Sequence, residues 1–144
     1  MSNEDSTLNF NEQIIAEFRA NEGRAAAFGD APLLLLTTKG SKTGKEHTTP
    51  VMYLADEHDS TLVYVFASYA GADTHPAWYN NLLTNPYDVI VEVGVETNPA
   101  TPEVVDEPER SRIYAEQSRR FPGFSEYQAK TSRTIPVVAL RLHD

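Results

Sequence analysis

Short apolar runs and stretches in which apolar and polar residues alternate dominate this chain. Leu33–Leu36 is a continuous apolar run, which is typical of a strand covered on both faces. Pro99 and Pro102 confine their strand to a sheet edge or a bulge, because proline cannot donate to a ladder. The pattern predicts six strands, over residues 33–38, 47–54, 61–67, 89–93, 96–105 and 135–142, of which the first three form an antiparallel meander.

Four segments carry helix signals. Residues 9–22 have a capping-box pair, Asn9 and Glu12, and one apolar face. Residues 1–8, which precede this helix, are expected to fray. The other three helices are expected between His75-Pro76 and Asn85-Pro86, from Asp106 to about Arg120, and over Gly123–Lys130.

The order of these elements decides the fold class. Six mostly antiparallel strands with helices interspersed do not follow the β-α-β alternation of a doubly wound sheet. A chain of 144 residues can bury a core without disulfides or metals. We therefore expect an α+β fold, a small closed or split β-barrel with peripheral helices, in a single domain over residues 1–144.

The chain is acidic and has no cysteine. It carries 21 Asp and Glu against 12 Lys and Arg, a formal net charge of −9, which disfavours extended contact with nucleic acid or anionic lipid. The absence of cysteine excludes thiolate nucleophiles, and the four histidines lack ligand spacing, so no metal site is expected. No apolar run is long enough to span a bilayer and no export signal begins the chain, so a cytoplasmic location is expected.

Against this acidic background, three of the four lysines lie in one loop. Lys39, Lys42 and Lys45 alternate with Gly40 and Gly44 directly after the first predicted strand. Backbone N–H groups and ammonium groups that converge in such a loop favour an anionic ligand. The spacing is not that of a phosphate-binding P-loop, because only three residues separate the glycines and a strand follows instead of a helix. A solvated hairpin turn explains the same residues equally well.

Three more segments could contribute to a site. Ser68 follows the third predicted strand among small residues, where a ligand can approach the backbone and the hydroxyl can donate. The only tryptophan lies in the helical segment His75–Leu82, beside two asparagines whose position suggests a hydrogen-bonding task. Phe124 and Tyr127 share a helix face and could wall a flat, conjugated ligand. Ordinary core packing or a strand-to-helix connection also accounts for each feature.

In order, these segments resemble the deazaflavin-dependent nitroreductase family, the class A F420-dependent oxidoreductases of actinobacteria. The resemblance extends over nearly the whole chain from Phe10 to Leu142 and implies a split β-barrel related to flavin mononucleotide-binding barrels. It rests on an ordered set of segments: Leu33–Lys45, Thr48–Pro50, Ala67-Ser68, His75–Leu82, Asn85-Pro86, Phe121–Phe124 with Tyr127-Gln128, and Ile135-Pro136.

The resemblance also implies a cofactor and a set of site residues. The cofactor is coenzyme F420, whose phosphate and polyglutamate tail are anionic, so the lysine loop would receive them. Met52, Phe124 and Tyr127 are expected on the substrate side, with Tyr127 as the candidate catalytic residue, a proton donor or a substrate-positioning group. The implied cofactor-binding residues are Ser41, Lys42, Thr43, His47, Thr48, Thr49, Pro50, Ala67, Ser68, Tyr69, Trp78, Tyr79, Asn80 and Asn81.

Two positions depart from the family pattern. His47 stands where relatives often have Arg, so that contact would be weaker or pH-dependent. Tyr69-Ala70-Gly71 replaces a Lys-Gly-Gly that often follows the serine, with the loss of a cation and of backbone freedom. Affinity for the anionic tail is therefore expected to depend more on Lys42 and its neighbours.

The predicted function is hydride transfer from reduced F420 to a conjugated acceptor: a quinone, an activated enone or a nitroaromatic. Two alternatives stay open, a protein that binds F420 or a flavin without turning it over, and a reductase that uses flavin mononucleotide. An interaction-only module would leave the lysine loop and the Trp78–Asn81 cluster unexplained. The expected partner is a small-molecule acceptor and not a nucleic acid. A monomer is favoured, and a peripheral membrane contact through the helix at Phe10–Ala20 is left open.

Overall fold

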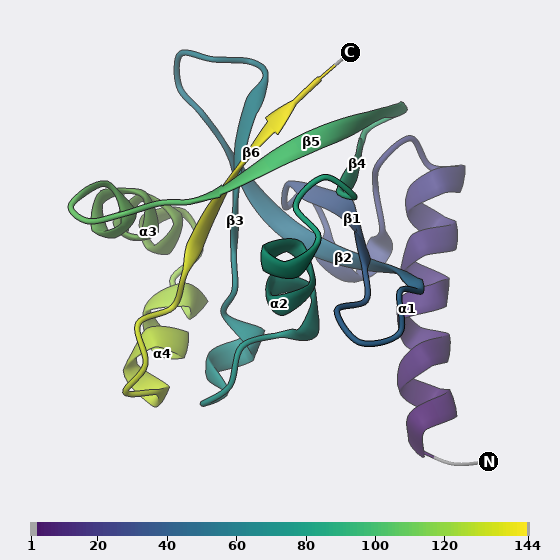
Figure 1. The fold of residues 1–144 in the computed structure, drawn as a ribbon, viewed down its shortest axis with the longest axis horizontal. Helices are drawn as coiled ribbons and strands as arrows, with labels where there is room; N and C mark the ends of the chain where they lie inside the picture. The colour runs from purple at the N-terminus through teal and green to yellow at the C-terminus, as the bar shows by residue number, and fades with distance from the viewer. Residues whose placement is uncertain (1–2, 144) are drawn as a thin grey trace.

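The computed structural model describes the backbone of residues 3–143 and the side chains of residues 10–143 (Figure 1). Its strands are β1 (Leu33–Lys39), β2 (Glu46–Ala55), β3 (Leu62–Phe66), β4 (Ile90–Val93), β5 (Glu96–Val104) and β6 (Val137–Leu142). All neighbouring strands are antiparallel, and they close into a barrel in the order β1-β2-β3-β6-β5-β4. The predicted α+β class and six-stranded barrel are therefore confirmed.

The helices pack around this barrel. They are α1 (Asn3–Ala20), α2 (Ala77–Thr84), α3 (Glu109–Arg120) and α4 (Gly123–Lys130), and short 3-10 turns cover Ala26–Phe28 and Tyr69–Gly71. Figure 1 shows α1 on one side of the barrel, α3 and α4 on the other, and α2 between them. The first helix begins at Asn3 and ends at Ala20, so the boundaries expected at residues 9 and 22 were both placed too late. Residues 1–2 of the predicted tail lie outside the described residues.

β1 is buried on both of its faces. Leu34 and Leu36 belong to the barrel core, whereas Leu35 packs with Ile14 and Phe18 of α1. Full burial of a leucine side chain stabilises a fold by about 1.5–3 kcal/mol. The unbroken apolar run of this strand is explained by two separate cores that each take alternate residues from it.

α2 packs its apolar face against the barrel core. Trp78 and Leu82, four residues apart, lie in the same buried cluster as Leu34 and Leu36. The spacing of these two α2 residues places them on one helix face. Core packing, the simpler interpretation of the sequence, therefore explains why most of the Trp78 side chain is buried.

β5 changes its partner along its length. Residues 96–99 pair with β4, and residues 100–104 pair with β6. Each half of the strand consequently pairs with one neighbouring strand only. At the junction, the Pro99 carbonyl accepts a hydrogen bond from the His143 N–H at 2.9 Å, and Asn98 Nδ2 donates to the His143 carbonyl at 2.7 Å, so a side chain supplies the donor that proline lacks. The edge character predicted for these prolines is thus present inside a closed barrel.

The end of α1 is tied to the hairpin between β4 and β5. The Arg19 guanidinium donates from Nε and Nη2 to the two carboxylate oxygens of Glu92, at 3.0 and 2.9 Å. Gly23, at φ +100°, approaches Gly94 so closely that a Cβ atom would lie 2.7 Å from the Gly94 Cα. Only glycine fits at this close approach. The contact between the two glycines helps to hold α1 against β1.

A second apolar cluster joins β2, β3 and β6 to the helices α3 and α4. The rings of Phe66, Tyr114 and Phe124 meet edge to face, with centroids 5.9, 5.5 and 6.3 Å apart. Such aromatic contacts add about 0.5–1.5 kcal/mol per pair beyond area burial. This cluster fixes α4 against the barrel.

One buried polar side chain of α3 has no partner. Gln117 is 0% exposed, and its side-chain amide makes no hydrogen bond to the described part of the chain. A buried, unpaired amide costs about 1–3 kcal/mol. Gln117→Leu should therefore raise the free energy of unfolding in urea by about 1 kcal/mol or more. Gln117→Glu is the opposite control, because it places a charge in the same space and should destabilise the fold. A leucine variant that is less stable than the wild type would contradict this account.

Candidate functional site

Two cavities adjoin beside the N-terminal end of α2. Their volumes are about 500 and 450 Å³, and both are lined by Thr49 of β2 and by Ala77 and Trp78 of α2. We call the first, which borders the lysine loop at residues 39–45, the loop cavity. The second, which borders α4, is the aromatic cavity. A ligand that spans the shared wall would contact both.

The loop cavity is lined by basic and uncharged polar side chains together with Gly40, Ala77 and Trp78. Lys42 and His47 are its basic residues, and no carboxylate of the described residues lines it, although the chain has 21 Asp and Glu. This charge pattern suits an anionic ligand. The lining residues are Thr38, Gly40, Ser41, Lys42, Thr43, His47, Thr49, Ala77, Trp78, Asn80 and Asn81.

Backbone hydrogen bonds shape the lysine loop. The Gly40 N–H donates to the Lys45 carbonyl at 2.7 Å, and the Gly44 N–H donates to the Gly40 carbonyl at 3.0 Å. Gly44 has φ +73°, and a Cβ atom on Gly40 would collide with the loop itself. The turn therefore needs both glycines. Lys42 is the only one of the three lysines that lines the cavity, whereas Lys39 and Lys45 lie outside it.

Asn81 joins α2 to the lysine loop. Its side-chain oxygen accepts a hydrogen bond from the Ser41 N–H at 3.0 Å, and its Nδ2 donates to the Thr38 hydroxyl at 3.2 Å. Asn85 makes a similar contact, from Nδ2 to the Lys39 carbonyl at 3.1 Å. Asn81 thus has the kind of hydrogen-bonding task predicted for this helix, and that task is to hold the loop at a set distance from α2.

The aromatic cavity has a largely apolar lining. Phe124 and Tyr127 of α4 form one wall, edge to face, with ring centroids 5.3 Å apart. No charged side chain of the described residues lines it, so it suits a flat, conjugated ligand. The lining residues are Asn11, Phe28, Thr49, Pro50, Val51, Met52, Phe66, Ser68, Tyr69, Ala70, Pro76, Ala77, Trp78, Phe124 and Tyr127.

The turn that follows β3 has an unusual backbone. Tyr69 and Ala70 have φ of +45° and +53°, and Gly71 follows at +82°. A Cβ atom on Gly71 would lie 2.8 Å from the Tyr127 carbonyl oxygen, so the turn packs directly on α4. Left-handed non-glycine residues cost about 1–3 kcal/mol each and occur where ligands are held. Tyr69 is 59% exposed beside the aromatic cavity.

Most of the residues proposed from the sequence line one of the two cavities. Three do not. The Thr48 hydroxyl lies 2.8 Å from that of Thr37 on the face of β2 opposite Thr49, while Ala67 and Tyr79 are buried in the barrel core. The lining members of the predicted set are Ser41, Lys42, Thr43, His47, Thr49, Pro50, Met52, Ser68, Tyr69, Trp78, Asn80, Asn81, Phe124 and Tyr127.

Sequence reasoning missed several lining residues. Gly40, Ala70 and Pro76-Ala77 lie inside segments that were singled out, so neighbourhood alone could have included them. Nothing along the chain signals Asn11 or Phe28, because only the packing of α1 and of the turn after it brings them to the aromatic cavity. The remaining missed residues are Thr38, Val51 and Phe66.

Two titratable rings, His75 and Tyr79, lie close to Trp78 in the chain and line neither cavity. The His75 and Tyr79 ring centroids are 4.7 Å apart. Burial, together with the nearby Arg133 guanidinium, lowers the pKa of His75 below its ordinary value. Burial raises the pKa of the Tyr79 phenol. Both rings are therefore neutral near pH 7.

Three further features of the described residues concern other kinds of site. An open groove of about 640 Å³ lies between α3 and α4, but it contains none of the predicted site residues, and Arg110 in it already donates to Ile135 and Gln128. Among the described side chains, those of residues 10–143, no cluster of three or more metal-ligating groups is found. Within that same range, no helix has the length and apolar character needed to cross a membrane.

Comparison with known proteins gives consistent similarities. A family model described as F420H(2)-dependent quinone reductase matches residues 10–141. An F420H(2)-dependent quinone reductase of Mycobacterium tuberculosis is 35% identical over 130 residues, which cover 87% of this chain and 85% of that protein.

Two solved structures extend the similarity to three dimensions. One, of an F420-H2 dependent reductase, has 33% identity and a TM-score of 0.66, and the match covers 76% of this chain and 94% of that one. Another, described as a domain-swapped dimer, has 31% identity and a TM-score of 0.69, with coverage of 97% and 100%. The similarity therefore reaches beyond the barrel strands to the helices around them.

Proposed function

The chain belongs to the F420H(2)-dependent quinone reductase family, and on that premise we propose that its two cavities bind reduced coenzyme F420 and a quinone side by side. Membership confirms the resemblance found in the sequence, with F420 as the cofactor and an F420H2-dependent reductase activity. The observation that carries the proposal is the wall of Thr49, Ala77 and Trp78, shared by a cavity suited to an anion and a cavity suited to a flat ring.

The residues of the loop cavity fit the anionic part of this cofactor. Lys42 and His47 would hold the phosphate and the tail, because the Lys42 ammonium and the His47 ring can donate hydrogen bonds where no described carboxylate competes. Gly40 lines this cavity, and a Cβ atom there would lie 2.9 Å from the Thr43 hydroxyl oxygen, which lines it too, so the glycine avoids displacing that side chain. Asn81 would keep the loop in place through its bond to Ser41.

The residues of the aromatic cavity fit the reacting groups. When bound, the reduced deazaflavin supplies a hydride, and a quinone that takes up this hydride and one proton becomes a hydroquinone. Phe124 and Trp78 would exclude water and keep two flat rings in contact. Tyr127, which lines the same cavity, would donate the proton through its phenol, with water as the other source.

Lys42→Ala should weaken the binding of F420 about tenfold or more, because it removes the only lysine that lines the loop cavity. Fluorescence titration of the purified protein with F420 measures this loss. Lys45→Ala is the matched control, since Lys45 belongs to the same loop but lies outside the cavity.

Equal losses in the two variants would show that the loop acts only through its overall charge. The same titration with flavin mononucleotide distinguishes the cofactors. A wild-type protein that binds flavin mononucleotide and not F420 would overturn the assignment.

Tyr127→Phe should lower the turnover of F420H2 with a soluble quinone by about tenfold to a hundredfold, because a positioned proton donor is lost. F420 affinity should stay close to that of the wild type, since the phenol is expected to contact the acceptor. The rate of acceptor-dependent F420H2 oxidation measures turnover. An unchanged rate would remove the proposed role, and a wild-type protein that binds F420 without any oxidation would instead be a carrier.

We also propose that α1 makes a weak contact with the bilayer from which a lipophilic quinone enters. Phe10 is 53% exposed on α1, and its neighbour Asn11 lines the aromatic cavity. Phe10→Ser should reduce co-sedimentation with phosphatidylcholine vesicles, whereas Tyr87→Ser, at a 96% exposed residue that lines neither cavity, should not. A wild-type protein that leaves such vesicles unbound would reject this contact. The monomer favoured from the sequence stays a prediction.

A further inference from the structure

Arg133, which lies between α4 and β6, has a side chain bonded almost entirely to backbone carbonyls. Its Nε donates to the Ala72 carbonyl at 2.8 Å, its Nη1 to the Ala67 carbonyl at 3.1 Å, and its Nη2 to the Ser68 carbonyl at 3.0 Å. Among the side chains of residues 10–143, no carboxylate forms an ion pair with it. The guanidinium therefore holds three carbonyls of one turn in a fixed geometry.

These carbonyls flank the left-handed residues of that turn. Tyr69 and Ala70, both at positive φ, lie between Ser68 and Ala72, and Ser68, Tyr69 and Ala70 line the aromatic cavity. A backbone in this conformation persists only where its surroundings hold it. Arg133 supplies bonds on both sides of the strained pair, so it holds the part of the turn that faces the cavity.

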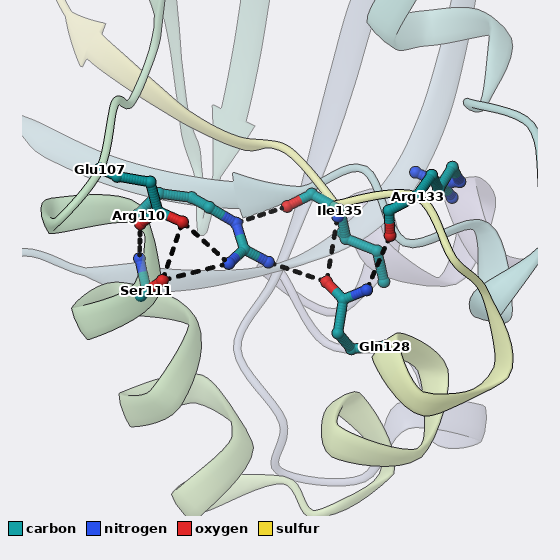
Figure 2. A network of polar contacts seen from close by, with 6 residues as sticks. All are labelled: Glu107, Arg110, Ser111, Gln128, Arg133 and Ile135. Carbon is teal, nitrogen blue, oxygen red and sulfur yellow. Dashed lines mark hydrogen bonds and ion pairs between the residues drawn. The ribbon is translucent and has the colours of Figure 1, made fainter.

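Arg133 is itself anchored through its backbone (Figure 2). Its carbonyl accepts a hydrogen bond from Gln128 Nε2 at 2.7 Å. The Gln128 side-chain oxygen in turn accepts bonds from the Ile135 N–H at 3.0 Å and from Arg110 Nη2 at 2.8 Å, and Arg110 Nε donates to the Ile135 carbonyl at 2.9 Å. Figure 2 shows that this network continues to Glu107 and Ser111 on the α3 side. We call the three hydrogen bonds from the Arg133 guanidinium to the turn the clamp. The backbone of the residue that forms the clamp is thus itself held by a hydrogen-bond network.

The same part of the chain also contacts the opposite wall of the aromatic cavity. Gln128 is adjacent to Tyr127 on α4, and Gly71 of the turn packs on the Tyr127 backbone. Lys130, at the end of α4, adds a bond from Nζ to the Ala70 carbonyl at 3.4 Å. The turn and the Tyr127 wall are therefore held at a set separation by contacts from one segment of the chain.

We propose that Arg133 is a positioning residue that fixes the Ser68–Gly71 turn against α4 and so sets the width of the aromatic cavity. The inference rests on the proposed function, because the cavity width matters only if two rings must be aligned there. Arg133 lines neither cavity and need not touch cofactor or quinone. Its effect is on the geometry of residues that do.

The pKa of His75 is sensitive to the same clamp, because its ring contacts the Arg133 guanidinium. Arg133 Nη1 lies 3.1 Å from His75 Nδ1, and since a guanidinium can only donate, Nδ1 accepts and the ring is neutral with its proton on Nε2. The groups that face this ring are Arg133 from the segment before β6 and Tyr79 from α2. The pKa of His75 is lowered from 6.5 by burial and by Arg133. The neutral ring's contribution to stability is therefore complete above pH 6.5 and is lost as the pH falls toward the lowered pKa.

The first test needs no cofactor. In Arg133→Met, hydrogen exchange of the amides of residues 67–72 should become about tenfold faster, because the turn loses the three hydrogen bonds that the guanidinium donates to its carbonyls. An NMR titration should show the pKa of His75 moving upward in the same variant. Arg141→Met is the matched control, since Arg141 is an exposed arginine of β6 that pairs with Asp59 and lines neither cavity, and it should change neither measurement.

The second test concerns the cofactor. In Arg133→Met, the affinity for F420 and the kcat with a soluble quinone should both fall about tenfold, while Arg141→Met should behave as the wild type. Arg133→Lys should recover only part of the loss, because one ammonium group cannot hold three carbonyls in the same geometry. If the methionine variant does not fold, both tests are made with the lysine variant instead.

Each outcome decides a separate point. If the amides of residues 67–72 exchange hydrogen at the wild-type rate in a folded variant, Arg133 does not hold the turn. Faster exchange with wild-type F420 affinity and turnover would overturn the positioning role. A wild-type protein that fails to bind F420 would reject the proposed function, while the exchange and titration measurements would still decide whether Arg133 holds the turn.

Discussion

The burial of β1 on both faces is the constraint on which the rest of this structure depends. Alternate leucines of the strand enter the barrel core and the contact with α1, and its pairing with β2 and β4 closes the barrel. Because the strand is held on four sides, its end at Lys39 is fixed as well. The lysine loop therefore emerges at one place, beside α2, and the position of the site follows from the packing of the core.

α2 shows how closely stability and function are joined here. One face of this helix, with Trp78 and Leu82, completes the barrel core, while Asn81 holds the lysine loop. Trp78 also lines both cavities, so the residue that seals the core forms the wall between them. A change that loosens α2 would alter the loop, the wall and the core at once. Hydride transfer needs two rings held in contact, and such a rigid support is suited to that requirement.

The elements that the sequence predicted well are those whose signal is local. Short apolar runs, alternation and turn residues located all six strands, because each strand reports its own burial. The start of α1 was misplaced because residues 3–8 have no apolar period. Lys42 and Trp78 could be proposed from composition and resemblance. Asn11, Phe28 and the clamp of Arg133 could not, since they reach the site only through contacts between segments far apart in the chain.

The sequence by itself determined the number and antiparallel character of the strands, the contrast between an acidic chain and a cationic loop, and the family to which the chain belongs. Only the tertiary structure decided that Lys42 alone among the loop lysines faces a cavity, that two cavities share a wall, and that three carbonyls meet one guanidinium. The physical reason is that periodicity and composition report the environment of one element at a time. A cavity is defined by the distances between several elements, and those distances are set by the packing of side chains on all of them.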